Sequence, residues 1–183
     1  MTNTTILSEA VLRVEAANGS VHLTRAGHCT ALQAASTGGR LEAALHPHQP
    51  GIITIGLSAA WVWGAVRTQP RVMQYAVRNT ARGRLKSDVP HTLREQHYEG
   101  DDVVTLRFRQ VTSPVRTILE LLSSADWTNL EYQVAIRLLL MSYDPQGAGT
   151  RGRLAARTRF QNGAQLRERL SAQLSSERIK RRR

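Results

Sequence analysis

Residues 111–122 read Val111-Thr112-Ser113-Pro114-Val115-Arg116-Thr117-Ile118-Leu119-Glu120-Leu121-Leu122, and this pattern predicts the end of a strand followed by the start of a helix. Ser113 suits the N-cap, because its hydroxyl can accept a backbone N–H bond. Pro114 suits the first helical position, where a missing N–H leaves no bond unmade. Arg116 and Glu120 lie one helical turn apart and are able to pair. The segment therefore predicts a well-capped structural helix.

The apolar residues on both sides of Ser113 support this interpretation. After the cap, a stripe at i, i+3, i+4 and i+7 contains Val115, Ile118, Leu119 and Leu122, which is typical of a helix with one buried face. Before the cap, Val104, Leu106 and Phe108 alternate with polar residues, which is typical of a strand with one buried face. The chain is thus expected to run from a sheet into a helix.

The length and composition favour a globular protein. A chain of 183 residues with 41% hydrophobic residues can bury a core, as one domain or as a small domain joined to a larger one. No apolar run approaches the roughly 18 residues of a membrane span, and the N-terminus has no signal-peptide pattern. We therefore expect a cytoplasmic protein. The single cysteine, Cys29, excludes an intrachain disulfide, and we expect no metal and no cofactor.

The positive charge is concentrated near the C-terminus. Residues 151–183 contain eleven Lys and Arg against two acidic residues, a net charge of +9. Residues 1–150 hold fourteen basic and twelve acidic residues, a net charge of +2. A concentrated basic region predicts an anionic partner, either a nucleic acid or an acidic protein surface.

Residues 1–55 are expected to form a winged helix-turn-helix-like segment. Its three helices would cover residues 5–17, a short stretch capped by Thr24, and residues 30–35, and a break at residues 36–39 would lead to a strand at 52–55. The third helix offers Gln33 as its main candidate for a base contact but contains no Arg or Lys. This composition argues against base-specific reading through that helix.

The middle of the chain is expected to form a small mixed β-sheet. Ser58 would cap a short helix that carries Trp61, and strands are predicted at residues 71–77 and around 91–97. The turn between these strands is basic, with the candidate site residues Arg78, Arg82 and Arg84. That turn is either an ordinary solvated loop or a phosphate-binding one. Asp101 and Asp102 are explained by a turn that precedes the next strand.

Helices are expected to follow to the C-terminus. One would bury a stripe of Leu130, Val134, Leu138 and Met141. A final helix would pack, on the domain or on one partner helix, through Leu166, Leu170 and Leu174. Between them, a helix over about 150–160 carries the candidate binding residues Arg151, Arg153, Arg157 and Arg159. The predicted fold class is therefore α+β, with a winged-helix-like segment at 1–55 and an α+β domain with basic C-terminal helices at 56–183.

Three stretches in order carry a resemblance to a known family. They are Ser58-Ala59-Ala60-Trp61-Val62-Trp63-Gly64, the junction at residues 111–122, and Arg151-Gly152-Arg153-Leu154-Ala155-Ala156-Arg157. Together they resemble the AbiEi-type antitoxins and transcriptional regulators, members of type IV toxin–antitoxin systems, over about residues 56–159. The family usually has Asp where this chain has Glu120. The resemblance implies an N-terminal winged helix that binds operator DNA and a C-terminal domain that acts against a nucleotidyltransferase-like toxin. It also implies that Arg116 and Glu120 are structural members of this junction, beside the cap residues Ser113 and Pro114. By the same resemblance, the working surface would consist of Arg151, Arg153, Arg157 and Arg159.

Three functions remain open from the sequence. The leading hypothesis is a non-enzymatic DNA-binding regulator of the AbiEi type, since the chain has no P-loop, GxSxG or HExxH motif. The second is a sequence-tolerant nucleic-acid-binding module that acts through its basic C-terminus. The third is a protein-interaction module whose arginine helix docks on an acidic partner.

Overall fold

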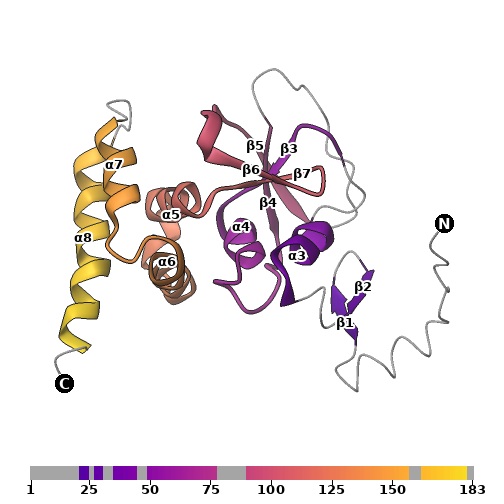
Figure 1. The fold of residues 1–183 in the computed structure, drawn as a ribbon, viewed down its shortest axis with the longest axis horizontal. Helices are drawn as coiled ribbons and strands as arrows, with labels where there is room; N and C mark the ends of the chain where they lie inside the picture. The colour runs from indigo at the N-terminus through magenta and orange to yellow at the C-terminus, as the bar shows by residue number, and fades with distance from the viewer. Residues whose placement is uncertain are drawn as a thin grey trace.

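The computed structural model describes the backbone of residues 21–24, 27–30, 35–44, 49–77, 90–156 and 162–180. Side chains are described within 35–44, 49–77, 90–156 and 162–175. These parts combine a five-stranded mixed sheet with helices, which confirms the predicted α+β class (Figure 1). None of the helices in the described residues is long and apolar enough to cross a membrane.

The sheet has the strand order β5-β4-β3-β7-β6. Its strands are β3 (Ile52–Thr54), β4 (Met73–Val77), β5 (His91–Glu95), β6 (Val103–Leu106) and β7 (Arg109–Thr112). The central strand β3 pairs antiparallel with β4 and parallel with β7. The edge strands β5 and β6 pair parallel with β4 and antiparallel with β7, respectively. The mixed sheet expected from the sequence is thus present, and β3 lies at its centre.

Helices cover the sheet and extend away from it. They are α3 (Thr37–Ala44), α4 (Gly56–Val62), α5 (Pro114–Ser123), α6 (Leu130–Tyr143), α7 (Ala148–Ala156) and α8 (Gly163–Lys180), with the 3₁₀ turns η1 (Gly100–Asp102) and η2 (Ala125–Thr128). Figure 1 shows α3 and α4 against the sheet and α5 to α8 grouped on the other side of the molecule from α3. One apolar core runs from the sheet through α3 and α4 into the helical group.

The strand-to-helix junction forms as predicted. Helix α5 begins at Pro114, and the Ser113 hydroxyl accepts a hydrogen bond from the N–H of Arg116. Thr117 donates to the carbonyl of Ser113, and the indole N–H of Trp63 donates to the carbonyl of Thr112 at 2.7 Å. These bonds pair the backbone groups that a turn from strand to helix would otherwise leave unpaired. The final helix also packs as expected, since Leu166 and Leu170 are buried.

The N-terminal prediction is wrong in the described residues. Residues expected as a link and a helix cap instead form an antiparallel hairpin of β1 (Val21–Thr24) and β2 (Gly27–Thr30). The expected break at 36–39 is the start of α3, because the Ser36 hydroxyl accepts the N–H of Gly39 and Arg40 donates to the carbonyl of Val62. The expected order of three helices before a strand is therefore not found there. The helix predicted over 5–17 lies outside the described residues, and so do residues 31–34 of the helix predicted over 30–35.

The strand predicted over residues 104–109 is in fact a hairpin. Strands β6 and β7 pair so that Leu106 lies opposite Arg109, and Arg107 and Phe108 form the two-residue turn between them. Both turn residues have positive φ, 47° and 67°, as a tight hairpin turn of this kind requires. Phe108 was expected to be buried, but it is 88% exposed. Its apolar character matched the alternation by coincidence.

The buried face of α6 is also different from the predicted one. Leu130, Val134, Leu138 and Met141 are exposed. The side that faces the core carries Tyr132, Ala135, Ile136, Leu139 and Leu140. Both sets follow helical spacing, because most of the circumference of α6 is apolar. Periodicity therefore could not indicate which set faces inward.

Candidate functional site

A buried ionic network lies where α5 meets the sheet. Arg116 is 4% exposed, and its Nε lies 3.2 Å from Oε1 of Glu120, whose side chain is 10% exposed. On its other side, Nη1 of Arg116 lies 3.7 Å from Oδ2 of Asp102, which is 2% exposed. The predicted Arg116–Glu120 pair is therefore real, but it is part of a triad. Asp102 was interpreted only as a turn residue, so its role in this triad is a correction.

Glu120 also caps a helix that is distant in sequence. Its Oε2 accepts the N–H of Gly56 at 3.0 Å, and Oε1 of Gln74 accepts the next N–H, that of Leu57, at 2.8 Å. The first N–H groups of α4, which have no partner inside the helix, are thereby paired. The expectation that Ser58 caps this helix is wrong. Ser58 lies inside α4, is fully buried, and accepts the N–H of Gln74.

Gly56 is the residue that makes this cap possible. It has φ +56°, and a Cβ placed there would lie 2.1 Å from Oε1 of Gln74. Any other residue would be strained in that backbone conformation and would displace the glutamine side chain. The sequence signal for this role was a single glycine directly after a predicted strand, which is too common a feature to identify it.

Tyr98 closes the network from the side of the sheet. The Arg116 guanidinium carbon lies 5.0 Å from the centre of the Tyr98 ring, within the range of a cation–π contact. The Tyr98 hydroxyl lies 3.4 Å from Oε1 of Glu120, and burial together with the charge of Glu120 raises the pKa of Tyr98. Burial also raises the pKa of the Glu120 carboxyl, while the charge of Arg116 and the N–H of Gly56 oppose that rise. These groups hold α4, α5 and the sheet together.

A small cavity adjoins the network. It has a volume of about 120 Å³, and its lining includes Gln74 of β4, Arg94 of β5, Arg116 and Glu120 of α5, and Ser124 and Tyr132 beyond α5. The cavity therefore lies between the sheet and the first part of the helical group. The sequence did not indicate a cavity here, because its lining comes from five separate elements, α4, β4, β5, α5 and α6, and from the segments between them.

The predicted arginine surface divides into different environments. Arg153 lies at the turn η1, where its Nη2 is 3.0 Å from Oδ2 of Asp101 and its Nη1 is 3.7 Å from Oδ1 of Asp102. Arg151 is exposed on α7 and donates to the carbonyl of Gln146. Arg153 thus ties α7 to the turn η1, and Arg151 faces solvent.

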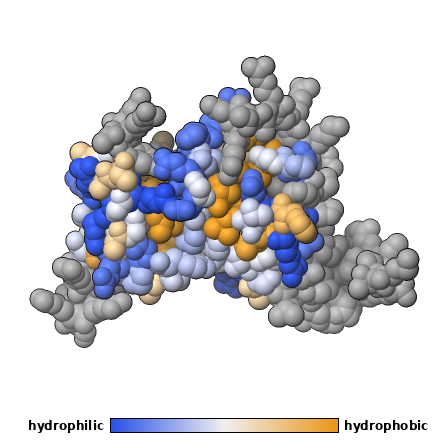
Figure 2. Space-filling model, turned by 45° about the horizontal axis from the view of Figure 1, so that its top comes forward, coloured by the Kyte–Doolittle hydropathy of each residue, from blue (hydrophilic) through white to orange (hydrophobic). Residues whose placement is uncertain are grey.

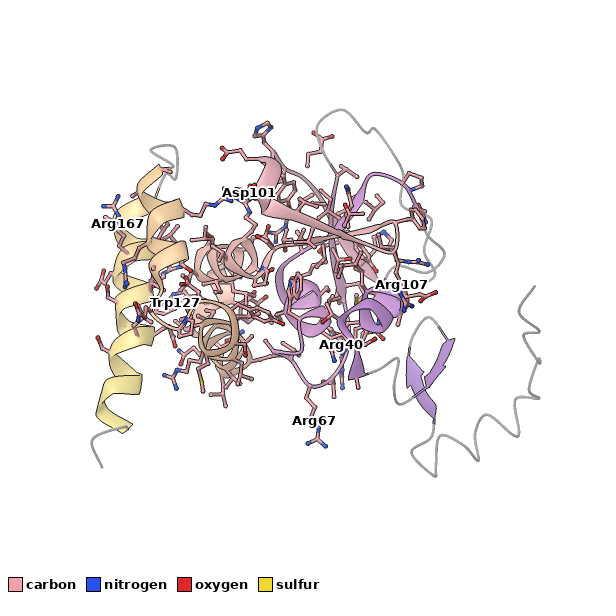
Figure 3. The ribbon with its side chains drawn as sticks, viewed as in Figure 1. Arg40, Arg67, Asp101, Arg107, Trp127 and Arg167 are labelled. Atoms are coloured by element: carbon pink, nitrogen blue, oxygen red, sulfur yellow. The ribbon has the colours of Figure 1, made fainter. Side chains whose placement is uncertain are left out.

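Helix α8 supplies further basic side chains. Arg167 is exposed and projects away from the molecule, on the opposite side from α3 (Figure 3). Arg169 has a structural role, because its guanidinium carbon lies 4.6 Å from the centre of the Trp127 ring and it donates to the carbonyl of Leu122. Figure 2 shows the side of the molecule formed by α7 and α8 as largely hydrophilic, with hydrophobic residues gathered nearer the middle.

The remaining predicted site residues lie outside the described part of the chain. They are Gln33, Arg78, Arg82, Arg84, Arg157 and Arg159. Among the residues whose side chains are described, no group of three or more His, Cys, Asp or Glu side chains could hold a metal ion.

Comparison with protein families, with characterised proteins and with solved structures found no match for this chain. The AbiEi resemblance therefore rests on the three sequence stretches that carry it. It remains a hypothesis about the family.

Proposed function

We propose that this chain is a non-enzymatic, DNA-binding regulator of the AbiEi antitoxin type, which contacts phosphate through its basic C-terminal helices. The observation that carries the proposal is the net charge of +9 on residues 151–183. Arginine suits this role, because its planar guanidinium forms paired hydrogen bonds with phosphate oxygens. The resemblance adds neutralisation of a nucleotidyltransferase-like toxin as a second part of the proposal.

Exposed arginines on the two basic helices support the phosphate contacts. Arg151 and Arg167 are both exposed, and within the described residues neither forms an ion pair with an acidic side chain. Arg153 is a poorer candidate, because its guanidinium already lies beside Asp101. The buried triad supports a structural role for Arg116, as the resemblance implies.

The test is the salt dependence of DNA binding. Each phosphate contact on duplex DNA adds about −0.9 to the slope of log K against log salt. If Arg151 and Arg167 both touch phosphate, changing both to Gln should flatten that slope by about 2 units. The matched control is Arg67→Gln, which also removes an exposed arginine but lies away from α7 and α8 (Figure 3). It should leave the slope unchanged.

Substitution is a cleaner test than deletion of the C-terminal helices. Leu154, Leu166 and Leu170 belong to the main core, so their removal would disturb the fold as well as the charge. A slope that is equal in the wild type and the double variant would contradict phosphate contacts by these two arginines.

A second measurement separates operator binding from sequence-tolerant binding. The wild-type protein is titrated against the DNA upstream of its own gene and against a scrambled duplex, at two salt concentrations. An operator-binding regulator should prefer its own site by roughly a thousandfold or more. Equal affinities for the two duplexes would favour the sequence-tolerant nucleic-acid-binding module. Failure to bind either duplex would favour an acidic protein partner, the alternative that the exposed arginines also support.

A further inference from the structure

We infer that the cavity between the sheet and the start of the helical group binds a small molecule that carries a carboxylate or phosphate group. Its volume of about 120 Å³ is several times the space that a single water requires. It therefore has room for such a group and a few further atoms. The inference concerns a site apart from the exposed arginines of α7 and α8.

The carboxylate and amide oxygens that line the cavity already accept hydrogen bonds. Oε2 of Glu120 accepts from Gly56 and Thr112, and Oε1 of Glu120 accepts from Arg116. Oε1 of Gln96 accepts from the Tyr98 hydroxyl at 3.0 Å. Oε1 of Gln74 likewise accepts the N–H of Leu57. A ligand that offered donors would have to compete with bonds that the fold itself requires.

Several hydrogen-bond donors in the cavity lining have no hydrogen-bond partner. Arg94 lines the cavity from the edge strand β5 and is exposed, and within the described residues its side chain has no hydrogen bond or ion pair. The amide nitrogen of Gln74 and the hydroxyl of Tyr132 form no hydrogen bond with a described residue either. Nη1 of the buried Arg116 makes no hydrogen bond, although it lies 3.7 Å from Oδ2 of Asp102 in an ion pair. Donors without partners favour a ligand rich in acceptor atoms.

The charge of the lining points the same way. The charged side chains that line the cavity are the guanidinium groups of Arg94 and Arg116 and the carboxylate of Glu120. Arg116 also pairs with Asp102, which is not part of the lining, so Arg94 supplies the positive charge that has no acidic partner within the described residues. Arginine donates two parallel hydrogen bonds to a carboxylate or phosphate, and such charge-assisted bonds are stronger than neutral ones. Arg94 reaches the cavity from the sheet, whereas Ser124 and Tyr132 reach it from the helical group, so one ligand would contact both parts.

The experiment is thermal unfolding of the full chain with added inorganic phosphate or succinate, at ionic strength matched with chloride. A ligand that binds only the folded state stabilises it by mass action. At a hundredfold excess over Kd, the Tm should rise by roughly 5 to 10 °C. Comparing the rise in Tm with phosphate and with succinate would also show which of the two anionic groups the cavity prefers.

Two variants make the test specific to the cavity. Arg94→Gln removes the exposed guanidinium from the lining and should lower the affinity for the effective probe at least about tenfold. Arg67→Gln removes the same charge from an exposed position that does not line the cavity, and it should retain the full stabilisation. The inference is overturned if neither probe raises the Tm above the chloride control. It is equally overturned if Arg94→Gln keeps the wild-type response, because the anion then acts elsewhere.

Discussion

Arg116 and Arg167 place the same side chain in opposite surroundings. Arg116 is 4% exposed and lies between Asp102 and Glu120 under the ring of Tyr98. Arg167 is exposed on α8 and projects into solvent. A buried guanidinium must be paired, because an unpaired charge in the interior costs several kcal/mol. An exposed one loses little when it leaves its neighbours, so it remains available for a partner. Surroundings rather than residue type separate the structural arginines from the candidate binding ones.

The largest effect is expected from Arg116→Ala. This change leaves the buried carboxylate of Glu120 without its cation and removes one of the two arginines beside Asp102. Loss of one partner of a buried pair costs about 3–5 kcal/mol. The Tm should fall by roughly 6 to 20 °C. Urea unfolding measures the change, with Arg167→Ala as the control. Arg167 is exposed on α8 and forms no ion pair within the described residues, so the control should change the free energy of unfolding by no more than about 0.5 kcal/mol. If both variants lost the same free energy of unfolding, the buried arginine would be no more important for stability than the exposed one.

The second effect is a pH dependence carried by Glu120. Its pKa is raised above the ordinary value of 4.5, so the folded state binds this proton more tightly than the unfolded state. The resulting stability is complete below about pH 4.5 and is lost as the pH rises through the raised pKa. Glu120→Gln cannot lose a proton. The stability of the wild type relative to this variant should therefore fall between pH 4.5 and neutral pH, by about 1.4 kcal/mol for each pH unit by which the pKa is raised.

Unfolding curves of both proteins at several pH values measure this difference. Parallel stability profiles across that range would show that Glu120 titrates at its ordinary value. That outcome would mean that Arg116 and the N–H of Gly56 fully offset the effect of burial.

A smaller effect is expected from Ser113→Ala. The hydroxyl of Ser113 accepts the N–H of Arg116 at the start of α5, and loss of such a cap costs about 1 kcal/mol. Thermal melts of Ser113→Ala and Arg116→Ala, run in parallel, measure how much the cap and the ionic triad each contribute to the stability of the junction. A loss as large as that of Arg116→Ala would indicate that the cap, and not the ionic triad, dominates the stability of the junction.

The smallest effect on stability is expected from the double variant Arg151→Gln and Arg167→Gln. Both side chains are exposed, so the free energy of unfolding should change by no more than about 0.5 kcal/mol. Chemical denaturation measures it on the same samples that are used for DNA titration. A larger loss of stability would show that these arginines are structural, as Arg116 is. Any weakening of DNA binding would then be a consequence of a destabilised fold.

Local chemistry made some of these features predictable. The cap by Ser113, the proline that follows it and the spacing of Arg116 and Glu120 all act within one helical turn, and the structure contains each of them. Strands β3 and β4 were also found, because their apolar residues are short runs bounded by Pro and Gly. Where neighbours in sequence decide the geometry, the sequence is sufficient.

The remaining features depend on partners that are distant in sequence. The hairpin of β6 and β7 turns at Arg107 and Phe108, neither of which is a residue that favours positive φ. The start of α3 is held in part by a bond from Arg40 to the carbonyl of Val62. The cavity takes its lining from two strands, three helices and the segments between them. No local pattern encodes such contacts.

The capping of α4 by Glu120 has a consequence for the order of events during synthesis. Gly56 and Glu120 are 64 residues apart, and both N–H groups at the start of α4 rely on side chains that come later in the chain. Ribosomes add about 5–20 residues per second, so Gly56 waits roughly 3 to 13 s for its acceptor. During that interval α4 exists without its final cap, and its apolar residues are accessible to chaperones. The stable core of this protein is therefore completed only after α5 has left the ribosome.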